Sequence, residues 1–131
     1  MKAKKFLSVG AAVLAIVYGT AAFAAGSDDY ADAIIQLEAA EKSTPKDADV
    51  QNLLGFAHRK SGQLNKAAAY YSSALTLDPK HKGALEYQGE LFLMLGDKAS
   101  AEKNLQKLDK ICWLGCSELD DLRTAIRNYQ P

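Results

Sequence analysis

The chain has 131 residues, two cysteines and a formal net charge of zero, with sixteen basic and sixteen acidic residues. This balance, without a basic patch, argues against nucleic acid as a partner. No block of like charges and no low-complexity tract is present, so the composition favours one small folded domain.

Residues 1–24 have the three parts of a secretory signal peptide. Three lysines in the first five residues precede an apolar run from Phe6 to Val17, and small residues then end in Ala22-Phe23-Ala24. A membrane anchor or a buried core helix is the alternative, but the run is shorter than the roughly 20 residues that span a bilayer. We therefore expect cleavage after Ala24 and a mature chain with a net charge of −3, from 13 basic and 16 acidic residues.

Apolar residues recur at steps of three and four through the mature chain, which predicts an all-α fold. Asp47 and Asp97 stand where helix N-caps are needed. Gly62 fits a left-handed helix stop, and Pro79 cannot continue a helix. The predicted helices are Asp29–Ser43, Ala48–Ser61, Leu64–Leu77, Lys82–Leu95, Lys98–Ile111 and Glu118–Asn128.

A pattern of small and large residues repeats every 34 positions in the middle of the chain. Small side chains at Gly55 and Ala67 would let two facing helices approach closely, and Tyr71 would fill the space one turn further along. An ordinary helical bundle could show the same apolar stripe, but it would not keep a fixed period. The positions that define the repeat are Gly55, Ala67, Tyr71, Ala74, Pro79, Gly89 and Ala101.

On these residues the chain resembles the tetratricopeptide repeat family, and in particular small secreted members from Gram-negative bacteria that end in a C-x3-C segment. The resemblance covers roughly Asp29 to Lys110 and implies a short right-handed solenoid of antiparallel helix pairs. Residues 25–111 would form the repeat domain. It would comprise a half repeat at 29–46 and full repeats at 48–81 and 82–111, and the segment 112–131 would cap it.

The resemblance also implies a function, which is to dock a peptide or protein segment in a groove lined by the first helix of each repeat. We accordingly expect a non-enzymatic periplasmic scaffold with no cofactor, no nucleic-acid partner and no membrane contact after signal cleavage. The partner's identity and the oligomeric state stay open. The family's groove positions fall on Asp49, Asn52, Phe56, Arg59, Glu86, Tyr87, Glu90 and Met94.

These groove positions carry mixed chemistry. Phe56, Tyr87 and Met94 could pack a ligand side chain. Family members that clamp a C-terminal carboxylate use several Lys, Arg and Asn residues, so Glu86 and Glu90 argue against that mode. The alternative for each polar residue is that it is simply exposed to solvent and contacts no ligand.

No catalytic motif accompanies the repeats. Neither histidine has a second metal ligand or acid at helical spacing, and no nucleophile elbow, zincin motif or phosphate loop is present. His58 is expected to pack between helices, and His81 to lie in the polar turn after Pro79.

Cys112 and Cys116 leave two interpretations open. An exported chain favours a structural disulfide, whereas a thiol–disulfide or copper-handling accessory protein would use the same pair. In a continuous helix the two Cβ atoms would lie about 5–6 Å apart, and a disulfide needs about 3.5–4.5 Å. The bond therefore requires a break in the helix, which Gly115 offers.

Two further expectations concern the segment around the cysteines. Ser117 and Asp120 have the spacing of a capping box that would start the last helix. Trp113 is expected to pack against the helix Lys98–Ile111.

Overall fold

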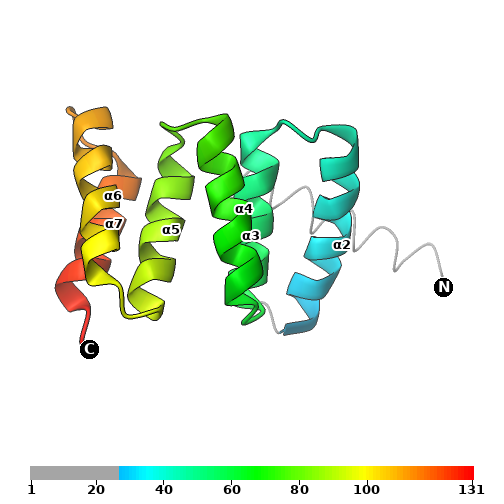
Figure 1. Cartoon of the computed structure of the whole chain (residues 1–131), viewed down its shortest axis with the longest axis horizontal. Coiled ribbons are helices and arrows are strands. Elements are labelled where there is room, and N and C mark those ends of the chain that lie inside the picture. The colour runs from blue at the N-terminus through cyan, green and yellow to red at the C-terminus, as the bar shows by residue number, and fades with distance from the viewer. Residues whose placement is uncertain (1–26) are drawn as a thin grey trace.

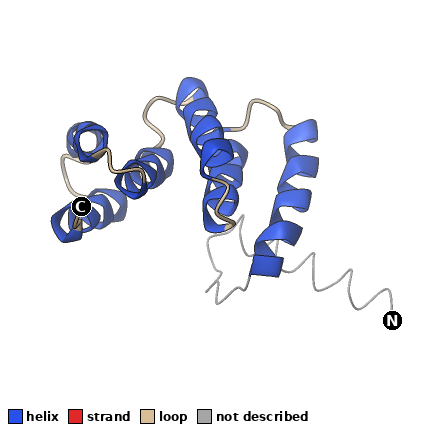
Figure 2. Ribbon diagram, turned by 60° about the horizontal axis from the view of Figure 1, so that its bottom comes forward, coloured by secondary structure: helices blue, strands red, loops and turns tan. Residues whose placement is uncertain are grey.

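The computed structural model describes residues 27–131, and the regular elements in this range are all helices (Figures 1 and 2). The predicted fold class is confirmed, and the helix ends differ from the predicted ones by two residues at most. None of the described helices is both long and apolar enough to cross a membrane. The signal peptide expected at 1–24 lies outside the described residues. The helices are α2 (Ser27–Ser43), α3 (Ala48–Lys60), α4 (Leu64–Leu77), α5 (Lys82–Met94), α6 (Lys98–Ile111) and α7 (Ser117–Asn128).

The helices follow one another as antiparallel neighbours along one axis of the molecule (Figure 1). Contacts run between α3 and α5 and between α5 and α7, and α7 also packs on α6. α5, α6 and α7 thereby form a three-helix cluster at one end (Figure 2). We call the side chains that α3, α5 and α7 present on their shared side the inner face.

Side-chain caps begin α3 and α6 where the sequence predicts them. One carboxylate oxygen of Asp47 accepts the backbone N–H groups of Asp49 at 2.9 Å and Val50 at 3.3 Å. The Asp97 carboxylate accepts the hydroxyl of Ser100 at 2.6 Å and its N–H at 3.0 Å. The hydroxyl bond, together with the backbone bond, holds the pKa of Asp97 below its usual value. After α3 the chain turns at Gly62, whose φ of 77° is in the left-handed region that favours glycine.

Three clusters of buried side chains form the core. The first joins α2 to α3, with Leu37 and Leu54 at its centre. The second lies between α4 and α5 around Tyr71 and Leu91. The third and largest binds α7 to α5 and α6, and consists of Leu85, Leu93, Ala101, Leu108, Cys112, Leu119, Leu122 and Ile126.

Two glycines in equivalent repeat positions make different contacts. A Cβ atom on Gly55 would lie 2.6 Å from ring carbons of Tyr71, which is fully buried on α4. A Cβ atom on Gly89 would lie 2.6 Å from a δ-methyl carbon of Leu122 on α7. Gly55 thus allows α4 to approach α3 closely, whereas Gly89 allows α7 to approach α5 closely.

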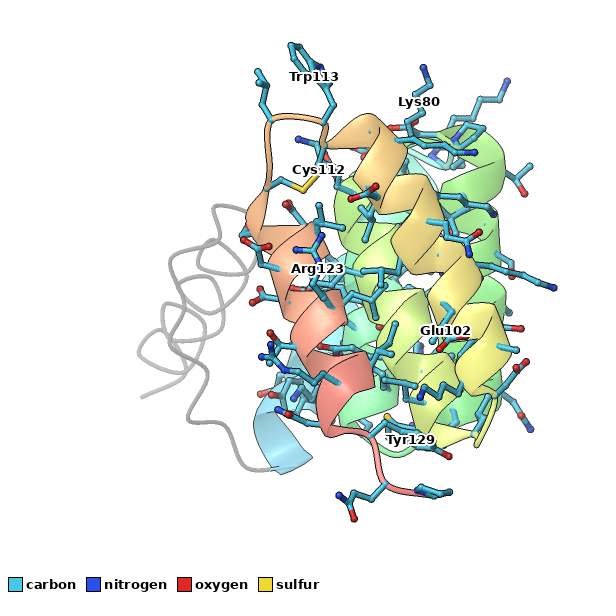
Figure 3. The ribbon with its side chains drawn as sticks, turned by 90° about the vertical axis from the view of Figure 1, so that its left-hand side faces the viewer. Lys80, Glu102, Cys112, Trp113, Arg123 and Tyr129 are labelled. Atoms are coloured by element: carbon cyan, nitrogen blue, oxygen red, sulfur yellow. A yellow bond between two sulfur atoms is a disulfide. The ribbon has the colours of Figure 1, made fainter. Side chains whose placement is uncertain are left out.

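The corner between α6 and α7 is closed by a disulfide between Cys112 and Cys116, whose Cα atoms are 5.6 Å apart (Figure 3). The predicted break in the helix is present. α6 ends at Ile111, the N–H of Gly115 donates to the carbonyl of Cys112 at 2.7 Å, and Gly115 has a φ of 89°.

Two expectations about this corner are wrong. The cap of α7 is Cys116, which makes no side-chain cap bond, and the Ser117 hydroxyl donates to Glu118 instead. Ser117 is already the first helical residue, so a capping box cannot form there. Trp113 does not pack on α6, because its side chain is 79% exposed and points away from the helices (Figure 3).

Candidate functional site

Aromatic rings from four helices, α2 to α5, form a row at the inner face. The rings of Phe56 on α3 and Tyr87 on α5 are tilted against each other with centroids 5.1 Å apart. Tyr30 on α2 approaches Phe56 edge-on at 6.3 Å, and the buried Tyr71 lies 6.4 Å from Tyr87. The half-buried Phe56 and Tyr87 rings are the part of this row that a ligand could contact.

Arg59 lies at the centre of this row. Its guanidinium carbon is 5.7 Å from the Phe56 ring centroid and 5.5 Å from that of Tyr87. It forms an ion pair with Glu90 at 2.7 Å, and only 9% of its side chain is exposed. Arg59 therefore already has a carboxylate partner and two rings, and its role is to hold α3 to α5.

Glu86 is a buried carboxyl one helical turn before Glu90. It is 8% exposed. Burial, together with the negative charges of Glu90, Asp121 and Glu118, raises its pKa from 4.5 to about 8, and Arg59 opposes this only in part. The Glu86 carboxyl is thus mostly neutral at pH 7.

Asn52 lies on the same face, next to a residue of α5 about one turn before Glu86. Its amide nitrogen is 3.1 Å from where a Cβ atom on Gly83 would lie, so Asn52 packs against the first turn of α5. Asn52 is 6% exposed, and its Oδ1 has no hydrogen-bond partner. A buried amide oxygen without a donor is costly, and a ligand N–H could satisfy it.

The two remaining predicted groove residues, Met94 and Asp49, lie at different places in the structure. Met94 is exposed at the far end of α5, with its sulfur 4.0 Å from the Arg59 guanidinium. Asp49 is apart from the aromatic row, at the start of α3, where its carboxylate is 2.8 Å from Nε2 of His81. Nδ1 of His81 accepts the N–H of Ala84 at 3.0 Å, so this histidine caps α5 as well as lying in a polar turn.

The sequence analysis does not predict three residues that act at this site. Tyr30 lies on α2, in the half repeat, where none of the family's groove positions falls. Glu118 and Asp121 lie on α7, and both act electrostatically on Glu86. Their spacing of three residues on a helix would have indicated them, had α7 been treated as a third inner helix.

His58 lies outside this site. As expected, His58 packs between helices. It is 2% exposed, stacks on Tyr70 with centroids 5.2 Å apart, and shares a hydrogen bond with Gln63 at 3.1 Å. Burial lowers the pKa of His58. Over residues 27–131, no three His, Cys, Asp or Glu side chains are grouped so that they could hold a metal ion.

Comparison with known families gives two overlapping matches to the tetratricopeptide repeat, over residues 19–82 and 57–113. The chain belongs to the tetratricopeptide repeat family. A comparison with curated proteins found no significant match. Gly55 on α3 and Gly89 on α5 are 34 residues apart, which is one repeat length of this family. Tetratricopeptide repeats suggest a scaffold for interaction between proteins.

Proposed function

We propose that this protein binds a segment of another polypeptide on its inner face and performs no chemistry of its own. The observation that carries the proposal is the half-buried pair Phe56 and Tyr87, held in place by Arg59 and bordered by Asn52 with its unpartnered oxygen. Rings of this kind supply contact area at small entropic cost. The Asn52 oxygen would accept a backbone N–H of the bound segment.

The proposal assigns different tasks to the groove residues. Phe56, Tyr87 and the exposed Met94 would form the apolar contact. Arg59 would position the rings, since its charge is already balanced by Glu90. Asp49 would lie outside the contact, because it is engaged with His81 at the start of α3.

We also propose that the chain acts in the periplasm after cleavage behind Ala24. The three-part pattern of residues 1–24 supports export, and an oxidising compartment agrees with the disulfide at the C-terminal corner. The mature chain would then comprise the repeat domain 25–111 and the capping segment 112–131. Fractionation of cells and the N-terminal sequence of the exported protein test this point independently of binding.

The binding proposal is tested with purified mature protein immobilised and exposed to a random peptide display library. Selected peptides should bind the wild type and lose most affinity for a Tyr87→Ala/Met94→Ser variant. Arg59 is left in place because removing it would strand Glu90. Ile35→Ala is the matched control, since Ile35 is 61% exposed on α2 and outside the inner face.

Two results would count against the inner face. One is a library that yields no binder to the folded wild type. The other is binding that Tyr87→Ala/Met94→Ser and Ile35→Ala reduce equally. Circular dichroism of each variant confirms that the helices are intact.

A further inference from the structure

The charged groups around Glu86 are mostly acidic. Glu90 lies one turn along on α5, and α7 packs against α5 with Leu122 on Gly89. Glu118 and Asp121 flank Leu122 on α7, and both act electrostatically on Glu86. Two cations of α3 lie on this face: Arg59, which is bound to Glu90, and Lys60, whose Nζ is 5.5 Å from the centroid of the Phe56 ring. Over residues 27–131, neither of them forms an ion pair with Glu118 or Asp121.

A buried amide about one turn of α5 away also points to a ligand on this face. Asn52 packs against Gly83, and Gly83 and Glu86 are three residues apart on α5, so they share one side of that helix. The Oδ1 of Asn52 is buried and has no donor. An acceptor without a partner beside a row of carboxylates calls for a ligand that carries donors and positive charge.

We propose that the inner face selects positively charged segments, with a Lys or Arg side chain of the partner placed against Glu86, Glu118 and Asp121. This inference rests on the proposed peptide binding and goes beyond it by naming the charge of the partner. The rings of Phe56 and Tyr87 would take the aliphatic part of the same side chain. Asn52 would accept a backbone N–H next to it.

Glu86 gives the selection a dependence on pH. Its carboxyl is mostly neutral in the free protein at pH 7. A cation placed next to it favours the ionised form, so binding would release a proton and tighten as the pH rises from 6 to 9. A Lys of the partner stays charged over this range, since its ordinary pKa is about 10.4.

The charge of the selected peptides is the first test. Peptides selected from the random display library on wild-type mature protein should be enriched in Lys and Arg and depleted in Asp and Glu. The best of them is then synthesised with each Lys or Arg replaced by Gln. We expect the Gln version to bind at least about tenfold more weakly, which corresponds to about 1.4 kcal/mol.

Charge-neutralising variants locate the contact. Glu118→Gln/Asp121→Asn should weaken the cationic peptide about three- to tenfold and reduce the dependence of binding on salt. Glu38→Gln/Glu102→Gln removes the same charge from exposed positions on α2 and α6 and should leave affinity unchanged (Figure 3 labels Glu102). Glu86→Gln should abolish the rise of affinity between pH 6 and pH 9.

The outcomes separate this inference from the proposed function. Neutral or acidic peptides that are selected, and that Tyr87→Ala/Met94→Ser releases, would overturn the inference and leave peptide binding standing. If Glu118→Gln/Asp121→Asn and Glu38→Gln/Glu102→Gln reduce the affinity for the cationic peptide equally, the inference is also overturned. The overall charge of the protein would then explain the preference for cationic peptides. No selected peptide at all would overturn both.

Discussion

The buried carboxyl of Glu86 is expected to have the largest effect on how the free energy of unfolding depends on pH. Its pKa rises from 4.5 to about 8 on folding, so the folded state keeps a proton that the unfolded chain has lost over this range. Stability must therefore fall as the pH rises through this window. Each pKa unit corresponds to about 1.4 kcal/mol, and the full shift corresponds to about 5 kcal/mol. This is comparable to the whole stability of many small domains.

Glu86→Gln isolates this effect, because Gln has nearly the same shape and does not ionise. Wild type and variant should be similar in free energy of unfolding near pH 4.5. The variant should be the more stable by several kcal/mol at pH 9. Urea unfolding followed by far-ultraviolet circular dichroism, measured at steps of pH on purified mature protein, gives both curves.

The comparison removes contributions that the two proteins share, including that of the buried His58. Glu102→Gln on the exposed surface of α6 is the control and should follow the wild-type curve. Parallel pH profiles for wild type and Glu86→Gln would refute the reasoning, since they would mean that Glu86 ionises in the folded state near its ordinary pKa.

Three further predictions concern the two helix-contact glycines, the disulfide and the buried histidine. Gly55→Ala should destabilise the protein by about 1–3 kcal/mol, because the new Cβ meets a fully buried ring. Gly89→Ala should cost less, since a Leu122 methyl can turn aside; equal losses in urea unfolding would contradict this order. Cys112→Ser/Cys116→Ser should lower the free energy of unfolding by about 2 kcal/mol for a five-residue ring while peptide binding is kept, and an unchanged melting temperature would show that the bond is not a structural staple. His58→Gln should flatten the loss of stability below pH 6.5, because burial lowers the pKa of His58 and the wild type must gain a proton there on unfolding.

The sequence predicts the helices and their order well because the signals for them are local. Asp47, Asp97 and Gly62 act within one turn of the backbone, and each acts as predicted. The 34-residue period then fixes which helices pair, since each repeat must bury its apolar stripe against the next. Nothing beyond these short-range rules is needed to obtain the all-α solenoid.

The site is less accessible to sequence reasoning because its properties arise between helices. Arg59 and Glu90 are 31 positions apart, and only the packed structure shows that they neutralise each other. The electrostatic environment of Glu86 depends equally on α7, through Glu118 and Asp121. A residue-by-residue transfer of groove positions selects Arg59, Glu86 and Glu90 but does not give their charge state.

The C-terminal corner shows a second kind of failure. The break at Gly115 follows from helix geometry if the cysteines pair, and the export signal favours their pairing. The direction of Trp113 does not, because it depends on the turn that the closed ring imposes. Trp113 is expected to pack on α6, but in the five-residue loop its side chain is exposed to solvent.

The placement of Trp113 also determines the intrinsic fluorescence of this protein. It is the single tryptophan of the chain, and its indole is exposed on a loop closed by a disulfide, which is a quencher of indole fluorescence. Emission from folded protein should be weak and centred at the long wavelengths of a hydrated indole. Unfolding of the core would change this emission little, whereas reduction of the disulfide would brighten it. The native fluorophore is therefore a reporter of the thiol state of the corner.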